Sequence, residues 1–257
     1  MSTASDQIEA FAATVDEAAR TSTAIPQFPA DAFDVDTAYQ IQAASVARRC
    51  ERHEFQTGIK MGFTSLAKMQ QMGVNDMIWG RLTDSMMIPE GGTADMSRFI
   101  HPRVEPEVAF LLCEDLAGDV SIPEAMAAVE AVAPALEVID SRYENFKFSL
   151  ADVIADNTSA AGYVLGNWSS PDISLENLGI VMSINGRMRQ CGSSAAILGN
   201  PYRSLVHAAR LADEAAEPLQ AGWIVLAGAA TASEFMQSGD TIRAEFQNLG
   251  NVSFSIE

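Results

Sequence analysis

Apolar positions in the first fifth of the chain recur at helical spacing. Residues three or four apart share one face of a helix, so two such stripes predict two helices, with the proline-containing stretch of residues 26–29 as the turn between them. The stripes consist of Ile8, Phe11, Ala12 and Val15, and of Tyr39, Ile41, Ala43 and Val46. We therefore expect a helical N-terminal segment over residues 1–57.

From Gly58 onward the pattern changes to short apolar runs that Gly, Asp and Asn interrupt. Runs of four to eight apolar residues between turn-forming residues are typical of strands. The later strands are expected at residues 179–184, 223–227, 241–246 and 252–256, with a helix over 204–216. The predicted fold class is mixed α/β (α+β), in which residues 58–257 form one compact, sheet-rich unit behind the helical segment.

Three carboxylates interrupt segments that otherwise have the composition of buried strands. Residues 104–112 alternate so that Glu105 and Glu107 share one strand face with Ala109 and Leu111, while the opposite face is apolar throughout, with Val104, Val108, Phe110 and Leu112. Glu137 lies in a second apolar run, residues 135–139. These glutamates are the candidate functional residues with the strongest pattern.

The segment between the two glutamate strands has a clear helix signal. Ser121 and Glu124 have the spacing of a capping box, and Pro123 is suited to the first helical turn, so a helix is expected through residues 125–132. The order resembles a strand–helix–strand crossover, which would bring the two glutamate strands close together in one sheet.

Ionised carboxylates that converge in apolar surroundings are unfavourable unless a cation compensates their charge. Oxygen ligands without a neighbouring Cys/His cluster suit a hard ion such as Mg²⁺. The pattern predicts a divalent-metal enzyme. The alternative is an edge strand with solvated glutamates, because Pro106 cannot donate to a sheet ladder.

Composition excludes several kinds of partner. The chain has 257 residues, 48% of them hydrophobic, which is enough for a substantial core. Sixteen basic against thirty-four acidic residues give a formal charge of −18, and this field repels phosphate backbones and anionic membranes. We expect no nucleic-acid partner and no membrane partner, and an anionic substrate would need a local cation.

The cysteines and the first residues favour a cytoplasmic protein. The three cysteines, Cys50, Cys113 and Cys191, are far apart and form no CxxC pattern, which argues for a reducing compartment. The beginning of the chain lacks the basic region and apolar run of a signal peptide. No apolar stretch approaches the roughly 20 residues that span a bilayer.

Other chemically capable residues are less distinctive. Lys60 lies in an apolar, strand-like run and is a candidate acid–base or carboxylate-binding group, although surface lysines are far commoner. Arg142 offers a bidentate fork for a carboxylate, or it pairs with charges in its own loop. Residues 155–161 combine small and amide side chains, which by themselves indicate only a turn.

Three blocks together resemble the hydratase/decarboxylase branch of the fumarylacetoacetate hydrolase superfamily. They are Lys60-Met-Gly-Phe-Thr-Ser-Leu-Ala-Lys-Met-Gln-Gln-Met-Gly73, Arg103-Val-Glu-Pro-Glu-Val-Ala-Phe110 and Glu137-Val-Ile-Asp-Ser-Arg-Tyr-Glu-Asn-Phe-Lys-Phe148. Residues 155–159 and 195–201 fit the same pattern. The resemblance covers nearly the whole chain, and it is the ordered set of blocks that makes it specific.

The resemblance implies a reaction and a set of site residues. Glu105, Glu107 and Glu137 are expected to bind Mg²⁺ or Mn²⁺, and Lys60 to act as the acid–base or substrate-binding lysine. The further implied positions are Asp140 and Ser159 as catalytic residues and Asn157 as a substrate-binding residue, to which the fork of Arg142 is added.

The expected reaction is decarboxylation of 2-oxo-3-hexenedioate (4-oxalocrotonate) to 2-hydroxypenta-2,4-dienoate in the meta-cleavage degradation of aromatics. The alternative within the branch is hydration of 2-oxopent-4-enoate, whose substrate lacks the distal carboxylate. Arg142, Lys147 and Arg81 are the candidates to position that carboxylate. The resemblance also implies a small anionic 2-oxo acid as substrate, a homo-oligomer and a complex with the sister hydratase.

Two readings from other classes remain open at this stage. A non-catalytic acidic protein would leave the glutamates solvated and would show no metal dependence. A relative that hydrolyses acylpyruvates would need a base to activate water, and no suitable histidine is found beside the glutamate strand, since His101 is expected in the turn before it.

Overall fold

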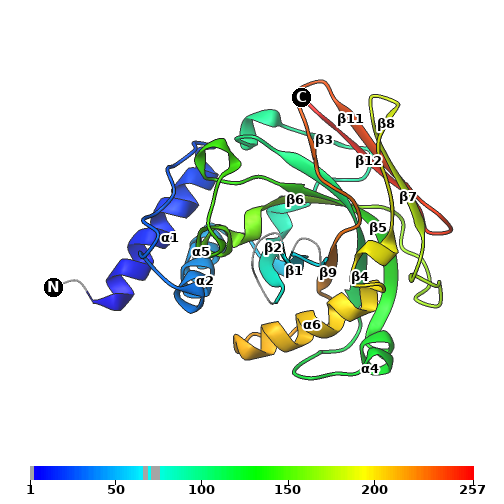
Figure 1. Ribbon diagram of the computed structural model, residues 1–257, viewed down its shortest axis with the longest axis horizontal. Helices are drawn as coiled ribbons and strands as arrows, with labels where there is room; N and C mark the ends of the chain where they lie inside the picture. The colour runs from blue at the N-terminus through cyan, green and yellow to red at the C-terminus, as the bar shows by residue number, and fades with distance from the viewer. Residues whose placement is uncertain (1–2, 66–68, 71–75) are drawn as a thin grey trace.

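A computed structural model describes residues 3–65, 69–70 and 76–257, and Figure 1 shows a helical N-terminal part beside a body of two sheets. The predicted fold class is therefore confirmed. Within the expected Lys60–Gly73 block, residues 66–68 and 71–73 lie outside the described residues. No helix in the described part of the chain is both long enough and apolar enough to cross a membrane.

The N-terminal segment consists of two helices, as the apolar stripes predict. Helix α1 spans Ala4–Arg20 and helix α2 spans Val35–Glu51. Thr3 and Asp6 form a capping box at the start of α1, and the Asp34 side chain caps α2, so each helix begins where a side chain accepts an otherwise unpaired backbone N–H.

The larger sheet has the strand order β2-β1-β9-β4-β5-β6, with β10 paired to β4. Its strands are β1 (Gln56–Gly62), β2 (Ile78–Thr83), β4 (Arg103–Leu112), β5 (Val129–Ile139), β6 (Ala160–Leu165), β9 (Ile224–Ala229) and β10 (Glu234–Phe235). Segments from both halves of the chain thus lie side by side.

The smaller sheet packs against the larger one through β11 and β12, which contact β5. It has the order β3-β12-β11-β7-β8, with the bounds β3 (Thr93–Ala94), β7 (Gly179–Ile184), β8 (Arg187–Ser193), β11 (Thr241–Phe246) and β12 (Gly250–Ile256). The main core contains Val104, Val108 and Phe110 together with Ile242 and Phe254. The apolar face of β4 is therefore the core face, and its glutamates point the other way.

Three further α-helices lie in the described residues 76–257. Helix α6 (Pro201–Glu214) packs on β9 and begins with Asn200 as N-cap and a proline in its first turn. The short helices are α4 (Ile122–Ala127) and α5 (Leu150–Ala155). Helix α5 contacts α2, and the buried Gln42 side chain donates to the carbonyls of Trp79 and Ile154, which fixes the N-terminal helices to the body.

Strand β4 is not an edge strand, so the alternative that Pro106 suggested is wrong. It lies between β9 and β5. The β9 register shifts by one residue between Glu107 and Ala109, which is a β-bulge, and the Pro106 carbonyl accepts a hydrogen bond from the Ala230 amide. The proline is tolerated in a central strand because the ladder is already interrupted there.

The expected strand–helix–strand crossover is also wrong. The capping box of Ser121 and Glu124 forms, but α4 ends at Ala127 and β5 begins at Val129. Strands β4 and β5 are antiparallel neighbours. The β-branched and alternating residues after position 128 continue as strand, because they pair with β4 along its whole length.

Candidate metal centre

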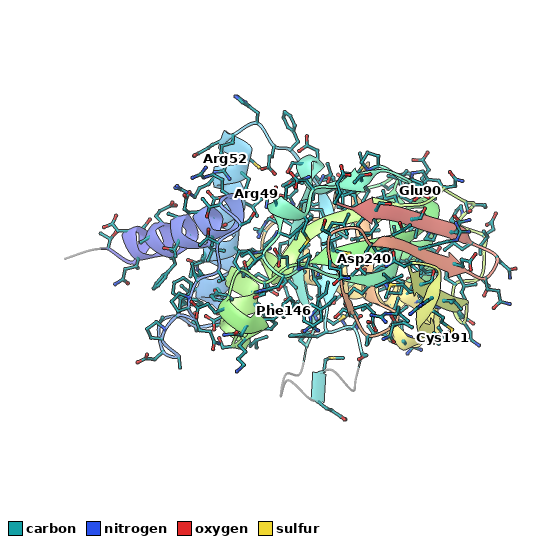
Figure 2. The ribbon with its side chains drawn as sticks, turned by 90° about the horizontal axis from the view of Figure 1, so that it is seen from above. Arg49, Arg52, Glu90, Phe146, Cys191 and Asp240 are labelled. Atoms are coloured by element: carbon teal, nitrogen blue, oxygen red, sulfur yellow. The ribbon has the colours of Figure 1, made fainter. Side chains whose placement is uncertain are left out.

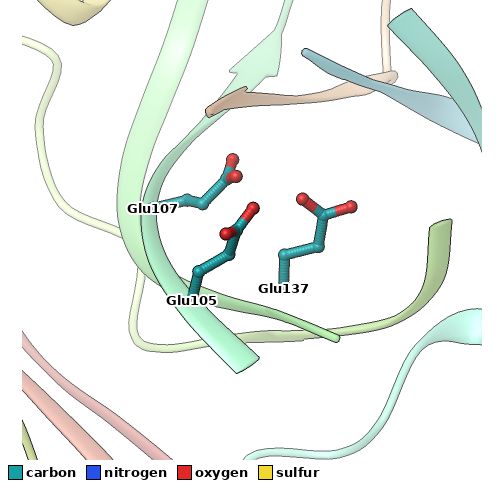
Figure 3. Close-up of side chains that lie close together, drawn as sticks. All are labelled: Glu105, Glu107 and Glu137. Carbon is teal, nitrogen blue, oxygen red and sulfur yellow. The ribbon is translucent and has the colours of Figure 1, made fainter. Parts of the chain in front are cut away.

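The antiparallel register of β4 and β5 brings the three glutamates together. Glu105 lies directly opposite Glu137, and Glu107 is two residues further along β4 on the same face. Figure 3 shows the three carboxylates pointing toward one another, and one ligand oxygen from each can be chosen so that all lie within 4.8 Å. The sequence prediction that these residues converge agrees with this geometry.

The cluster is buried and incompletely hydrogen-bonded. Glu107 and Glu137 have no exposed surface, and Glu105 is 6% exposed. Four buried oxygens of the cluster, Oε2 of Glu105, Oε1 of Glu107 and both oxygens of Glu137, have no hydrogen-bond partner among the described residues, although Oε1 of Glu137 forms an ion pair with Lys60. Carboxylate oxygens left unpaired in a buried site fit a bound hard cation, which would supply the missing partner and the compensating charge.

The backbone of β9 holds Glu107 in place. The Gly228 amide donates to Oε2 of Glu107 at 2.7 Å. Gly228 has φ of +103°, and a Cβ atom there would lie 2.1 Å from the Thr64 hydroxyl. Only glycine fits both the conformation and the space, so the bulge of β9 directs a backbone donor into the carboxylate cluster.

Lys60 is the cation nearest to the cluster among the described residues. It projects from β1, is 3% exposed, and its Nζ lies 2.8 Å from Oε1 of Glu137. Nζ also donates to the Thr158 carbonyl at 3.2 Å. Burial by itself would lower the pKa of Lys60, but the negative charges of Glu137, Glu105 and Glu107 outweigh it and raise the pKa above its usual value.

The carboxylates are correspondingly hard to ionise without a further cation. Burial raises the pKa of Glu137 to about 7, against the opposing effect of Lys60. Burial and the neighbouring Glu137 and Glu105 charges raise the pKa of Glu107 well above its usual range. The single ammonium group of Lys60 therefore does not neutralise the three carboxylates. A divalent cation would compensate the remaining negative charge.

A strained turn supplies the carbonyl that Lys60 contacts. Asn157, Thr158 and Ser159 all have positive φ, of 48°, 52° and 58°. Each such residue costs about 1–3 kcal/mol and persists only where its surroundings hold it. Strand β2 does so, because the Asn157 amide exchanges two hydrogen bonds with the Arg81 backbone and the Thr158 hydroxyl donates to the Trp79 carbonyl.

A cavity of about 500 Å³ adjoins the cluster. Its polar wall contains Lys60, Glu105 and the Ser159 hydroxyl, which is buried without a hydrogen-bond partner among the described residues. Its apolar wall includes Phe63, Ile139, Phe146 and Phe148. In the view of Figure 2, Phe146 lies between the N-terminal helices and the strands. The space suits a small, partly apolar molecule with a polar end at the glutamates.

Three of the residues expected at the site support it from outside the cavity. Both oxygens of Asp140 accept backbone hydrogen bonds, from Ile100 and His101, and the Asn157 amide is occupied by the Arg81 backbone. Arg142 is buried, and each of its guanidinium nitrogens donates to Asp156 or to the Ala160 carbonyl. Neither Arg142 nor Asn157 is among the described residues on the cavity wall, and their expected role in substrate binding stays a prediction.

The other two candidates for binding a distal carboxylate are not among the described residues on this wall either. Arg81 is paired with Glu217 and Gln42, and Lys147 is solvent-exposed and absent from the cavity wall. The missed residue is Arg103, which does line the cavity. The signal that identifies it is the strand period of two, since Arg103 shares its face of β4 with Glu105.

Comparisons with known proteins identify the family of the chain. The family model "Fumarylacetoacetate (FAA) hydrolase C-terminal" matches residues 44–257. A 4-oxalocrotonate decarboxylase of Pseudomonas sp. is 55% identical over 97% of this chain and 98% of its own length. A 2-keto-4-pentenoate hydratase of Paraburkholderia xenovorans (strain LB400) is 34% identical over 88% of this chain and 85% of its own length.

A solved structure is similar throughout. The 4-oxalocrotonate decarboxylase from Pseudomonas putida G7, complexed with magnesium and adipate, superposes with a TM-score of 0.96 at 36% identity, over 100% of this chain and 99% of that one. The resemblance predicted from the ordered blocks is confirmed, and the chain belongs to the fumarylacetoacetate hydrolase family.

Proposed function

We propose that this protein is a metal-dependent lyase that decarboxylates 2-oxo-3-hexenedioate to 2-hydroxypenta-2,4-dienoate. The observation that carries the proposal is the buried cluster of Glu105, Glu107 and Glu137 beside Lys60, at the end of a cavity of about 500 Å³. The higher identity to the decarboxylase than to the hydratase favours this reaction over hydration.

Mg²⁺ or Mn²⁺ would be held by the three glutamates and would supply Lewis-acid stabilisation of negative charge on a 2-oxo acid. The residues of the chain prepare the site for this. Gly228 fixes Glu107, and the pairing of β4 with β5 fixes Glu105 relative to Glu137, so the oxygens are oriented before any ligand arrives.

The reaction breaks the C5–C6 bond of the substrate, releases CO₂ and moves the electron pair through the C3–C4 double bond toward the keto oxygen. Lys60 keeps a proton at Nζ in the cavity wall, because the neighbouring carboxylates favour its charged form. We assign to Lys60 the stabilisation of the developing charge and the proton that settles the dienol product. Phe146 and Phe148 exclude water from the conjugated part of the substrate.

Purified protein with 2-oxo-3-hexenedioate and Mg²⁺ should release CO₂, and the substrate absorbance should fall at the same rate. Excess EDTA should reduce both rates to the uncatalysed level, and added Mg²⁺ should restore them. Metal-dependent consumption of 2-hydroxypenta-2,4-dienoate without CO₂ release from the diacid would transfer the assignment to the hydratase. No reaction with either compound would overturn the proposed function.

Mg²⁺ affinity should rise as the pH increases from about 6 to 8. The pKa of Glu137 is raised to about 7 and that of Glu107 lies well above its usual range, so protons compete with the cation below this pH and must be released when it binds. Isothermal titration in two buffers of different ionisation enthalpy would measure both the affinity and the number of protons released. A pH-independent affinity with no proton release would contradict the charge state that we assign.

The proposal extends to the setting of the enzyme. Cys50, Cys113 and Cys191 are all free and exposed, which suits a reducing cytoplasm. We propose a homo-oligomer that associates with a sister hydratase, on the strength of the family resemblance, and a division of the chain into a helical segment over residues 1–57 and a compact catalytic unit of residues 58–257.

A further inference from the structure

Arg103 lies on the wall of the cavity, two residues before the first glutamate of the cluster. As the first residue of β4 it occupies the same strand face as Glu105 and Glu107. The described residues of this wall include two cations, Lys60 and Arg103. Lys60 already forms an ion pair with Glu137 in the glutamate cluster. Arg103 is therefore the cation on this wall that remains for a second anionic group of a ligand.

The guanidinium of Arg103 has no ion pair within the described parts of the chain, although the protein carries a net charge of −18. Its Nε is buried and has no hydrogen-bond partner there. Arg103 as a whole is half-buried, but a buried N–H of a charged group without a partner is unfavourable, and this points to an anion that is bound during function. The arginine that was first expected to bind a carboxylate, Arg142, differs in this respect because Asp156 neutralises it.

Two aromatic rings hold Arg103 without satisfying its donors. Its Cζ lies 4.6 Å from the ring centre of Phe146 and 3.8 Å from that of Phe235, its cross-strand neighbour on β10. Asn145 and Phe146 both have positive φ, of 59° and 56°, so the loop after β5 is strained where it brings the ring over the guanidinium. Ring faces attract the cation but accept no directed N–H bond, and the donors remain available to a planar carboxylate.

We propose that Arg103 binds the distal carboxylate of a C6 2-oxo diacid and so determines specificity for the diacid; this inference rests on the proposed function. The spacing is suitable, because alternate residues of a strand lie about 6.6 Å apart. A six-carbon diacid, with five carbon–carbon bonds of about 1.5 Å in a zigzag, spans about 6 Å. A ligand with its oxo acid end at the glutamates therefore reaches Arg103 with its other end.

The rings also explain how such a contact is compatible with loss of that carboxylate as CO₂. An ion pair to the carboxylate stabilises the substrate more than the transition state, in which the charge moves toward the keto oxygen. The ring faces of Phe146 and Phe235 attract the positive charge of Arg103, so the cation remains stabilised after CO₂ departs. A substrate without the distal carboxylate gains no binding free energy from Arg103. Arg103 would therefore favour binding of the diacid over binding of the hydratase substrate.

The test compares two unreactive 2-oxo acids that differ only at the distal end, 2-oxoadipate and 2-oxohexanoate, by titration calorimetry with saturating Mg²⁺. Both lack the C3–C4 double bond that decarboxylation requires. The wild type should bind 2-oxoadipate about tenfold or more tighter than 2-oxohexanoate. Arg103→Gln should remove this preference and leave the affinity for 2-oxohexanoate unchanged, while Arg103→Lys should keep part of it.

Arg243→Gln is the matched control for loss of one positive charge, since Arg243 is an exposed residue of the smaller sheet, and it should keep the full preference. In turnover of 2-oxo-3-hexenedioate, Arg103→Gln should raise KM with a smaller effect on kcat. A preference that survives in Arg103→Gln would overturn the role of Arg103 and leave the proposed function standing. Failure of the wild type to bind either acid would overturn the proposed function and this assignment together.

Discussion

Glu107→Gln is expected to abolish metal-dependent turnover, lowering kcat/KM by about a thousandfold or more, because a divalent ion supplies several kcal/mol of charge stabilisation. Glutamine has nearly the same shape as glutamate and can still accept the Gly228 amide, so the local structure should persist. The lost element is one of three negative ligands. Mg²⁺ titration and CO₂ release, measured on the same preparation, would establish both effects.

The same variant should be more stable than the wild type in the absence of metal. Glu107 is fully buried beside two other carboxylates, and its replacement removes like-charge repulsion and a desolvated charge. Urea denaturation with EDTA present should give a higher midpoint. Glu130→Gln, on the exposed side of β5, is the control and should change neither activity nor the midpoint. Unchanged activity in Glu107→Gln would support a non-catalytic acidic protein instead.

Lys60→Met is expected to lower kcat by about 10²- to 10⁴-fold, the usual contribution of a positioned acid or base. Methionine fills similar space but carries no proton and no charge. Mg²⁺ should still bind, since the three glutamates remain and the competing ammonium group is absent. Stopped-flow measurement of substrate loss at saturating Mg²⁺ separates this defect in chemistry from a defect in binding.

The stability of Lys60→Met should change in the opposite direction to that of Glu107→Gln. Without metal, the variant leaves the buried Glu137 without its partner, and breaking such a pair costs about 3–5 kcal/mol. Added Mg²⁺ should recover most of this loss. Lys147→Met, at an exposed position, should behave as the wild type. Equal stability of Lys60→Met with and without Mg²⁺ would contradict the charge balance described for the cluster.

The shared face of Glu105 and Glu107 could be predicted from sequence because it follows from the strand period alone. Alternation places Glu105 and Glu107 on one face whatever the neighbouring strands are, and Val104 and Val108 identify the other face as core. The direction of β5 could not be predicted in the same way. A capping box marks where a helix begins, and nothing in the local pattern required α4 to end after Ala127.

The strained turn that contacts Lys60 could not be predicted from the sequence, for a different reason. Left-handed conformations are expected at glycine, and three consecutive non-glycine residues, Asn157 to Ser159, adopt them only because β2 holds them. The partners of charged side chains are equally hard to predict from sequence, as Arg142 and Arg103 show. Their sequence neighbourhoods do not reveal that Asp156 neutralises one and that two phenylalanine rings flank the other.

The antiparallel pairing of β4 with β5 has a consequence for how such a protein diversifies. All three carboxylates lie within one uninterrupted stretch, residues 103–139, that folds back on itself. Lys60, the strained turn and part of the aromatic wall come from outside this stretch. The hairpin that carries the three glutamates can therefore be inherited as a unit. Substitutions outside it, or at Arg103 where it begins, would adapt the cavity to acids of different length and charge.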